Sequence, residues 1–433
     1  MIPNNLRDTL SKKPRISLLP LHLYSSKKPP TAENMNVKFV NYKGRLGSEL
    51  VVGPSMCMSS LCYSIFKLEP YSGCSHQCAY CYARKFPGNH STTTARLGYP
   101  EQIKKYLQRA NMQWIPFRLS TLSDPFQPPE KSCKLSLKLL KICQELNIPV
   151  IISTKSPLPA SEPWLSTIKR LAEEKLTITQ FTVILLDDKK SRIIEPGAPP
   201  PSERLKAMEK LADEDIPVIA RLQPIIPFVN SDEEFLEEYV TTMKSIGTRQ
   251  IIAECYRFLG WKELSLFKQL ISEEKFKILK DRQTWEYYPD SPFKRPTLPI
   301  RLQILQSLAE ICKKHDMKFS TCREGFFHLH TAENCCGMHH FQRYIIRPTL
   351  HEVWKITMKR GEITIPDVIR CINEQNKKFL ENVTINGVRR ILLKHMKTLE
   401  CTLRSNLALS KICPVLKLED AKIKNCSETY YGK

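Results

Sequence analysis

Short apolar runs alternate with longer amphipathic stretches through the middle of the chain. The runs that we predict as strands are Cys62–Leu68, Phe117–Leu122, Val150–Thr154, Gln180–Leu186, Val218–Gln223 and Gln250–Glu254. Apolar residues recur at helical spacing between them, in Tyr99–Gln108, Leu135–Leu146, Glu162–Leu171, Ser202–Leu211 and Asp232–Ser245. Strand–helix units in succession are typical of a parallel sheet. We therefore expect an α/β fold, a partial (β/α)6 TIM-like barrel of parallel strands.

The pattern changes toward both ends of the chain. We expect residues 1–50 to form a basic extended N-terminal arm and residues 51–342 to form the barrel core. Within that core, 261–298 is polar with scattered aromatic residues, which indicates an insertion. An amphipathic helix over Ile300–His315 and a short strand over Lys318–Thr321 follow it. Residues 343–433 are rich in lysine and predict a helical, basic C-terminal region.

Charge is concentrated in the two end segments. The net charge is +22, and residues 1–50 and 343–433 carry net charges of +6 and +9, from 9 basic against 3 acidic and 18 against 9 side chains. A basic surface attracts polyanions such as nucleic acid. Lysine and arginine that merely solvate helices would give the same count, so the charge favours a nucleic-acid partner without requiring one.

Cysteine usage and hydropathy indicate the compartment. The chain has 16 cysteines, and a core of this size needs no disulfides, so we expect reducing, cytoplasmic conditions. The apolar run Ile16–Tyr24 contains Pro20 and His22, which is unlike a secretory signal. The longest charge-free run, Val51–Phe66, is shorter than the roughly 20 apolar residues that a membrane helix needs. We therefore expect no membrane span.

One segment carries a specific arrangement of thiols. Cys74, Cys78 and Cys81 are spaced C-x3-C-x2-C. Three thiolates on one loop can hold three irons of a [4Fe–4S] cluster and leave the fourth iron open for chemistry, whereas ferredoxin clusters use four cysteines. Structural or zinc-binding cysteines are the alternative, but zinc sites usually pair two C-x2-C motifs or add distant histidines. The spacing therefore favours an iron–sulfur cluster.

Polar residues follow each predicted strand, where the active sites of βα barrels lie. These residues are Ser123 and Asp124, Lys155, Asp187 and Asp188, Pro227–Asn230, and Tyr256 with Arg257. Their convergence on one rim indicates a functional site. Ser123 and Asp124 before Pro125 would also suit an ordinary turn, and Lys155 would suit an ordinary solvated strand end.

On these residues, the chain resembles the radical S-adenosylmethionine (radical SAM) enzymes and, within them, the relatives of spore photoproduct lyase. The matching segments are Glu69–Ala83 (EPYSGCSHQCAYCYA), Ser123–Glu130 (SDPFQPPE), Thr154–Ser156, Glu195-Pro196 with Arg204-Leu205, and Pro224–Pro227. They fall between residues 62 and 257.

The resemblance implies a [4Fe–4S] cluster and S-adenosyl-L-methionine as cofactors. It implies a lyase or transferase that cleaves the cofactor reductively to a 5′-deoxyadenosyl radical, which then abstracts hydrogen from the substrate. A flavodoxin- or ferredoxin-like reductant would be a partner. The substrate is unidentified, and the resemblance and the charge together favour nucleic acid, through lesion repair or RNA modification. The protein would supply ligation, orientation and exclusion of water.

The resemblance also implies roles for particular residues. Cys74, Cys78 and Cys81 would be iron ligands and catalytic residues, Tyr80 would lie against the adenine, Ser123 and Asp124 would bind the amino end or ribose, and Lys155 would bind the carboxylate or ribose. Tyr80 would equally suit a core aromatic residue. Two features depart from the family pattern. Gln77 stands where many relatives have glycine, and no Gly-Gly-Glu follows the second strand, for which Ser123-Asp124 is the candidate substitute.

A second group of soft ligands lies near the end of the predicted barrel. It comprises Cys322, His328, His330, Cys335, Cys336, His339 and His340. The spacing matches no familiar metal site, so a second metal, a thiol hydrogen donor such as Cys322 or Cys335, and ordinary buried side chains all stay open. Two other functions also compete: a non-catalytic iron–sulfur protein that senses redox state or binds nucleic acid, and a zinc-stabilised nucleic-acid-binding module. Neither needs Lys155 or Asp124 beside the cysteines, so we favour the enzyme.

Overall fold

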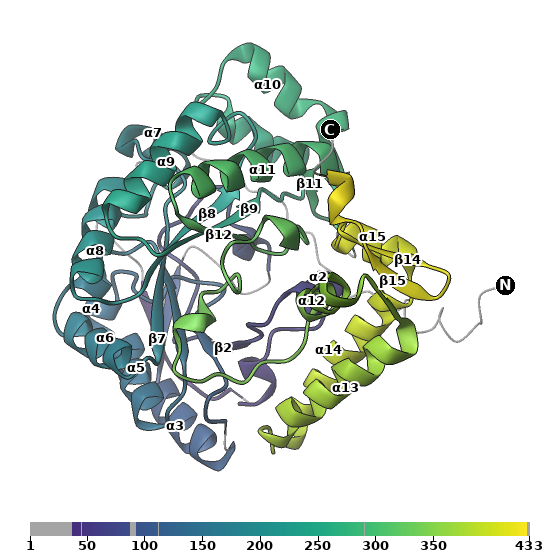
Figure 1. The fold of residues 1–433 in the computed structure, drawn as a ribbon. Helices are drawn as coiled ribbons and strands as arrows, with labels where there is room; N and C mark the ends of the chain where they lie inside the picture. The colour runs from purple at the N-terminus through teal and green to yellow at the C-terminus, as the bar shows by residue number, and fades with distance from the viewer. Residues whose placement is uncertain (1–36, 45, 87–91, 111, 290, 431–433) are drawn as a thin grey trace.

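The centre of the molecule is one parallel sheet. The computed structural model describes residues 37–430 except 45, 87–91, 111 and 290. The strands run in the order β12-β9-β8-β7-β6-β5-β2, and their bounds are β2 Phe66–Leu68, β5 Phe117–Leu119, β6 Val150–Thr154, β7 Thr177–Thr182, β8 Val218–Ile225, β9 Gln250–Cys255 and β12 Lys318–Thr321. The sheet curves into a partial barrel (Figure 1). The predicted α/β fold is confirmed, with a seventh strand because the short strand after the predicted 300–315 helix pairs with β9.

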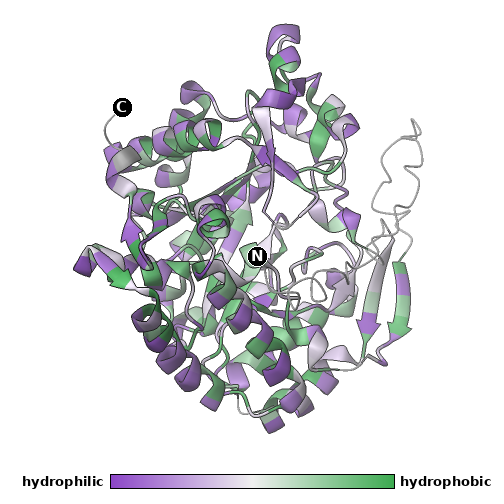
Figure 2. Ribbon diagram, turned by 90° about the vertical axis from the view of Figure 1, so that its right-hand side faces the viewer, coloured by the Kyte–Doolittle hydropathy of each residue, from purple (hydrophilic) through white to green (hydrophobic). Residues whose placement is uncertain are grey.

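Helices cover the outer face of this sheet. They are α3 Tyr99–Ala110, α5 Leu135–Glu145, α6 Trp164–Glu173, α8 Pro201–Asp213, α9 Glu233–Ser245 and α11 Leu298–Lys314 (Figure 1). Hydrophilic and hydrophobic residues alternate along their ribbons, as expected for helices with one buried face (Figure 2). Val150 and Ile152 of β6 pack with these helices in the main core. Because side chains alternate along a strand, Ile151 and Ser153 face the barrel interior.

Three strands differ most from their predicted bounds. β2 begins at Phe66 and not at Cys62, because Cys62 ends the short helix before it, and β5 ends at Leu119 and not at Leu122. β7 is Thr177–Thr182, whereas the hydrophobic pattern predicted Gln180–Leu186. Threonines begin the strand and are buried through hydrogen bonds to neighbouring backbone, from Thr177 Oγ1 to Val150 O (3.0 Å) and from Thr179 Oγ1 to Pro217 O (2.9 Å). Polar residues whose hydrogen bonds are made within the protein can be buried, so a prediction based on hydrophobic residues misses the start of such a strand.

Residues 335–341 fill the amino end of the barrel. Cys335, Met338 and Phe341 pack with inward-facing isoleucines that include Ile178 and Ile219. Gly337 has φ 76°, and a Cβ there would lie 2.1 Å from Ile219 Cδ1. This end is therefore closed by tight packing, which leaves the carboxyl end for a site.

The N-terminal segment and the 261–298 segment add small elements to the barrel. β1 (Val37–Asn41) pairs in parallel with β4 (Thr93–Leu97), which also pairs with β3 (Tyr71–Ser72). The 261–298 segment contains α10 (Glu273–Lys280) and the antiparallel pair β10 (Trp285–Tyr287) and β11 (Lys294–Pro296). Residues 1–36 of the proposed arm lie outside the described residues.

The C-terminal region covers the open side of the sheet between β12 and β2 (Figure 1). It contains α12 Leu350–Arg360, α13 Ile365–Glu381, α14 Asn386–Leu403 and α15 Asn406–Ile412. It also holds a three-stranded antiparallel sheet of β13 Glu362–Thr364, β15 Lys422–Asn425 and β14 Leu416–Glu419, which the helical pattern did not predict. We propose 343–433 as a separate unit of sequence that packs into the shared core.

A buried arginine joins this region to the start of the barrel. Arg347 is 1% exposed and donates hydrogen bonds to the carbonyl oxygens of Met58, Ser59 and Cys62. These carbonyls lie at the end of the short helix α2 (Met56–Leu61), where helical carbonyls lack intrahelical partners. The guanidinium group therefore caps α2 from the C-terminal side of the molecule.

Candidate active site

The three cysteines of the C-x3-C-x2-C motif lie on the loop that follows β2 and β3, at the carboxyl end of the sheet. Cys78 is buried, while Cys74 and Cys81 are half-buried. Burial raises the pKa of Cys78 to about 12, and burial, Asp124 and the other two thiols raise the pKa of Cys74. Thiols with raised pKa values, such as Cys74 and Cys78, stay protonated unless a cation binds them, so the loop has the chemistry of a metal-cluster site.

A turn after α7 (Asp188–Ile194) clamps this loop from one side. Ala79 N donates to Ile194 O (2.7 Å), and Gly197 N donates to His76 O (3.1 Å). A Cβ at Gly197 would lie 2.2 Å from Ser75 O. Only glycine allows the two backbones to approach this closely. No pattern in the sequence indicates that role, because Gly197 lies far from the motif.

Gln127 anchors the loop from the other side. Its Oε1 accepts from Ser75 N (3.1 Å) and from Thr93 Oγ1 (2.6 Å), and its Nε2 donates to Gly73 O (3.2 Å). The Gln127 side chain is fully buried, so its amide replaces water as the partner of the loop backbone. Gln127 lies inside the Ser123–Glu130 match, but pattern alone did not single it out.

Asp124 joins three strand ends. Its carboxylate accepts from Phe126 N (2.9 Å), Thr154 Oγ1 (2.7 Å) and Lys155 N (2.7 Å), and it contacts His76 Nδ1 at 3.4 Å. It is 6% exposed. The carboxylate is therefore occupied by the protein, and it fixes the position of Lys155 relative to the cysteine loop.

Ser123 lies on the same turn with its hydroxyl already bonded within the protein. Its Oγ lies 2.9 Å from Ser120 Oγ and donates to Tyr71 O at 3.2 Å. Ser120 Oγ in turn donates to the buried carboxylate of Glu69 (2.7 Å). Ser123 is half-buried, so one side of it faces the rim.

Lys155, Tyr80, Glu195 and Arg204 form a buried charged group beside Cys78. Lys155 Nζ lies 5.5 Å from the centre of the Tyr80 ring and 4.0 Å from Glu195 Oε1. Tyr80 donates its hydroxyl hydrogen to Glu195, whose other oxygen lies 2.6 Å from Arg204 Nη2. Burial alone would lower the pKa of Lys155, but Cys78 and Glu195 outweigh it and raise that pKa. Lys155 therefore carries a positive charge at the rim, while its side chain is 16% exposed.

Other residues predicted at the rim have different roles. Asp187 caps α7 by accepting from Lys190 N (2.9 Å), and Asp188 accepts from Ser202 N (3.0 Å). Both are exposed, because β7 ends at Thr182 and the chain has left the barrel before it reaches them. Asn230 is fully buried and donates to Ile184 O (2.9 Å), which holds a turn.

The 322–340 segment brings three thiols together in the barrel. Cys335 and Cys336 are buried, their sulfurs lie 3.7 Å apart, and both are free, as is half-buried Cys322. Within the part of the chain that the structure describes, no three His, Cys, Asp or Glu side chains gather closely enough to hold a single metal ion. A [4Fe–4S] cluster has a different requirement, because each thiolate binds its own iron.

Comparison with known proteins shows a radical SAM domain in this chain. Residues 68–239, about two fifths of the chain, match the model of the radical SAM superfamily. Uncharacterised relatives occur in Methanocaldococcus jannaschii (27% identical, 52% of this chain and 83% of the relative) and in Acidianus two-tailed virus (25% identical, 57% and 84%). An uncharacterised Mycobacterium tuberculosis protein is 22% identical over 42% of this chain and 56% of its own length.

Solved structures with a similar trace include spore photoproduct lyase. One mutant of that lyase is 12% identical with a TM-score of 0.47, covering 66% of this chain and 81% of the lyase. Another, with bound AdoMet and dinucleoside spore photoproduct, is 14% identical with a TM-score of 0.46, covering 60% and 76%. Streptococcus suis SuiB has a TM-score of 0.38 at 14% identity, covering 59% and 48%.

The radical SAM match marks this protein as an enzyme that uses a [4Fe–4S] cluster, S-adenosylmethionine and a reductant. The observed residues fit these cofactors. The cysteine loop offers one buried and two half-buried thiols, and Lys155 offers a partly exposed cation beside them. Among the described helices, none is both long and apolar enough to cross a membrane.

Proposed function

We propose that Cys74, Cys78 and Cys81 ligate the [4Fe–4S] cluster and that Tyr80, Ser123, Asp124 and Lys155 form the S-adenosylmethionine site. When bound, the cluster and S-adenosylmethionine supply a one-electron cleavage that produces a hydrogen-abstracting radical. The observation that supports this most is the clamping of the cysteine loop: Gln127 holds one side and Gly197 the other, directly beside Lys155. Such fixed positioning is what an open-iron site requires.

Lys155 and Asp124 have different roles in the proposed S-adenosylmethionine site. Lys155 presents a protonated amine at the rim, which suits the cofactor carboxylate. Asp124 uses both oxygens on protein donors, so we propose that it acts as a positioning residue that orients Lys155 and the loop. Ser123 can accept a hydrogen bond on its rim side. The Tyr80 ring, fixed through Glu195, would support the adenine.

We further propose that the substrate is a nucleic acid and that a flavodoxin- or ferredoxin-like protein is the reductant in a cytoplasmic setting. The net charge of +22 supports a polyanionic partner. A reductant with an acidic face would dock on a basic surface, so the same charge would suit both partners.

The decisive experiment measures 5′-deoxyadenosine. The protein is reconstituted anaerobically with iron and sulfide, then supplied with dithionite and S-adenosylmethionine. We expect product from the wild type, none from Cys78→Ala, and wild-type product from Cys401→Ala, which replaces an exposed cysteine away from the loop. A cluster-loaded wild type that yields none over several hours would contradict the proposal and favour the redox-sensing alternative.

A further inference from the structure

The barrel interior carries a row of polar side chains midway along the strands. Phe117 and Leu119 of β5 face the outer helices, so Arg118 between them faces inward. Arg221 of β8 faces inward in the same way, between Ala220 and Leu222. Both arginines are half-buried, so their guanidinium groups lie inside the barrel and still reach solvent.

Arg118 and Arg221 share neutral partners. Arg118 Nη1 donates to Ser153 Oγ (2.7 Å) and Gln180 Oε1 (3.0 Å), and Arg221 Nη1 donates to the same two atoms (3.1 and 2.9 Å). Neither arginine pairs with a carboxylate within the described residues, and Arg221 Nε is buried without a partner. Burial and the neighbouring Arg118 lower the pKa of Arg221 to about 10. Arg118 and Arg221 therefore place two positive charges close together, and no carboxylate among the described residues pairs with either of them.

Two more arginines stand at the ends of β9 and β12. Arg257 and Arg323 pair with the two oxygens of one carboxylate, Glu254, and their side chains are 16% and 18% exposed. Cys336 Sγ lies 3.4 Å from Arg118 Nη2. The four arginines together carry four positive charges. Glu254 supplies one negative charge, and Cys322 and Cys336 would add two if both were ionised, so the arginines would still be in excess.

A neighbouring pair of arginines, Arg295 and Arg301, is neutralised by carboxylates. Arg295 and Arg301 are 2% and 1% exposed and pair with Glu286 and Glu324, at 2.7–3.0 Å. Two cations meet two anions there, which is the arrangement expected of a structural network. The excess of positive charge is confined to the four interior arginines.

The strands that carry these arginines end beside the cysteine loop. Tyr82 directly follows Cys81, is 41% exposed, and donates to Thr121 O (3.0 Å). Thr121 lies three residues after Arg118, just beyond the end of β5, and Arg257 and Arg323 lie just beyond the ends of β9 and β12. The cysteine loop and the arginines are therefore connected at the carboxyl end of the sheet.

We propose that Arg118, Arg221, Arg257 and Arg323 bind a phosphate group of the substrate inside the barrel. Guanidinium forks match phosphate oxygens bidentately, and a phosphate brings the negative charge that this group lacks. The site rests on the proposed function, since it faces the cysteine loop. The phosphate belongs to a nucleic-acid backbone or to a small phosphorylated metabolite, and the two sources share this chemistry.

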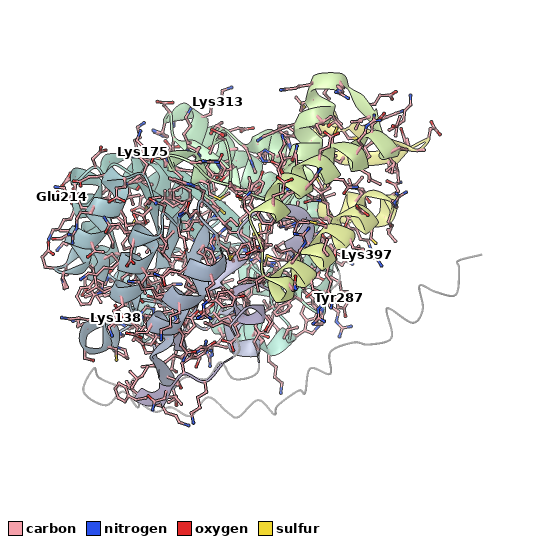
Figure 3. The ribbon with its side chains drawn as sticks, turned by 90° about the horizontal axis from the view of Figure 1, so that it is seen from below. Lys138, Lys175, Glu214, Tyr287, Lys313 and Lys397 are labelled. Carbon is pink, nitrogen blue, oxygen red and sulfur yellow. The ribbon has the colours of Figure 1, made fainter. Side chains whose placement is uncertain are left out.

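The test measures binding to the cluster-loaded full chain without reductant, so that no turnover is needed. The probes are pyrophosphate and labelled single-stranded DNA and RNA oligonucleotides of mixed sequence. Arg118→Gln/Arg221→Gln removes two interior charges. Lys394→Gln/Lys397→Gln is the matched control, because both lysines are exposed on α14 and Lys397 projects outward (Figure 3).

We expect the interior variant to bind about tenfold to hundredfold more weakly. If the bound probe is an oligonucleotide, the slope of log affinity against log salt concentration should become less steep by about 0.7, because the arginines contact one phosphate. Binding of pyrophosphate alone would identify a small metabolite, and binding of oligonucleotides would identify nucleic acid; both support the site. Arg118→Lys/Arg221→Lys should bind at an intermediate level, because charge is kept and the fork is lost.

Two results would overturn the inference. One is a wild type that binds none of these probes, and the other is a control variant that loses as much affinity as the interior variant. If Arg118→Gln/Arg221→Gln does not fold, Arg323→Gln at the more open end of the group should show the same loss. Because binding is measured without reductant, failure here is distinct from failure to form 5′-deoxyadenosine.

Discussion

Single residues decide whether the cysteine loop can take its path. Gln77 has φ 47°, in the left-handed region that glycine adopts without strain. This conformation suits the glycine that the family resemblance leads us to expect at this position. Gly197 is the second such residue, because the loop backbone lies against it.

At Gln77, backbone strain predicts a ranking of substitutions. Gln77→Gly should load iron as well as the wild type, with stability within about 1 kcal/mol, since lost strain and gained chain entropy offset each other. Gln77→Val should lose cluster, because a β-branched residue is a true outlier at this φ. Iron content per chain after reconstitution is the measurement, and equal loading of Gly and Val variants would contradict the ranking.

At Gly197, close packing predicts loss of the cluster. Gly197→Ala would place a methyl group 2.2 Å from Ser75 O, so the loop must move away from the turn after α7. We expect reduced iron loading and little or no 5′-deoxyadenosine. Gly387→Ala is the control: a Cβ there meets nothing within 4 Å, and alanine suits its place in α14. Normal loading of Gly197→Ala would show that the clamp is dispensable.

Between elements, buried charge holds the rim together. Arg204 of α8 is fully buried, donates to Thr182 O (3.0 Å) at the end of β7, and pairs with Glu195, which binds Tyr80 on the loop. One ion pair therefore connects a helix, a strand end and the cysteine loop. The alternation of apolar and polar residues predicted these elements, but it contains no information on which of them share a partner.

Removal of one member of this pair should be costly. Arg204→Met would leave Glu195 buried without its partner, and the free energy of unfolding should fall by about 3–5 kcal/mol. Lys169→Met is the control, because Lys169 and Glu214 form an exposed pair at 2.6 Å. Figure 3 shows Glu214 at the outer edge of the molecule. Urea unfolding compares the two variants. A loss for Arg204→Met no larger than for the control would show that the pair is not structurally important.

Across the whole molecule, the C-terminal region completes the barrel. His395 of α14 is fully buried, lies 2.7 Å from Ser59 Oγ and donates to Val52 O (2.8 Å). Phe379 of α13 packs near Phe66 of β2, with ring centres 6.3 Å apart. These contacts join residues more than 300 positions apart in the sequence. The stability of the C-terminal region therefore depends on the barrel, and the stability of the barrel depends on the C-terminal region.

His395 makes this packing sensitive to acid. Burial lowers the pKa of His395 to about 4, below its ordinary value of about 6.5. Between these values the unfolded chain binds a proton that the folded protein does not, so the free energy of unfolding falls as pH falls. From pH 7 to 5 the wild type should lose about 2 kcal/mol more than His395→Gln. Urea unfolding at both pH values measures this, and identical losses would contradict it.

Local patterns in the sequence were enough to predict the fold class and to locate the C-x3-C-x2-C motif. Strand and helix periods are local properties, and the C-x3-C-x2-C spacing lies on one loop, so both can be read without knowing what packs against them. Of the nine predicted elements from Val150–Thr154 to Lys318–Thr321, eight agree with the structure to within about two residues at each end. The predicted bounds of β7 were wrong because buried threonines at its start do not look like a hydrophobic strand. The predicted rim position of Asp187 and Asp188 was wrong because both are exposed and follow a strand that has already ended.

Only the tertiary structure decided how the site is held and what surrounds it. Gln127, Gly197 and the Glu195–Arg204 pair act on the cysteine loop across 50 to more than 100 residues of chain. The direction of Arg118 and Arg221 depends on which face of each strand the helices cover, which a single alternating pattern leaves undetermined. The physical reason is the same in both cases: packing and charge depend on distance in space, and only the folded chain fixes it.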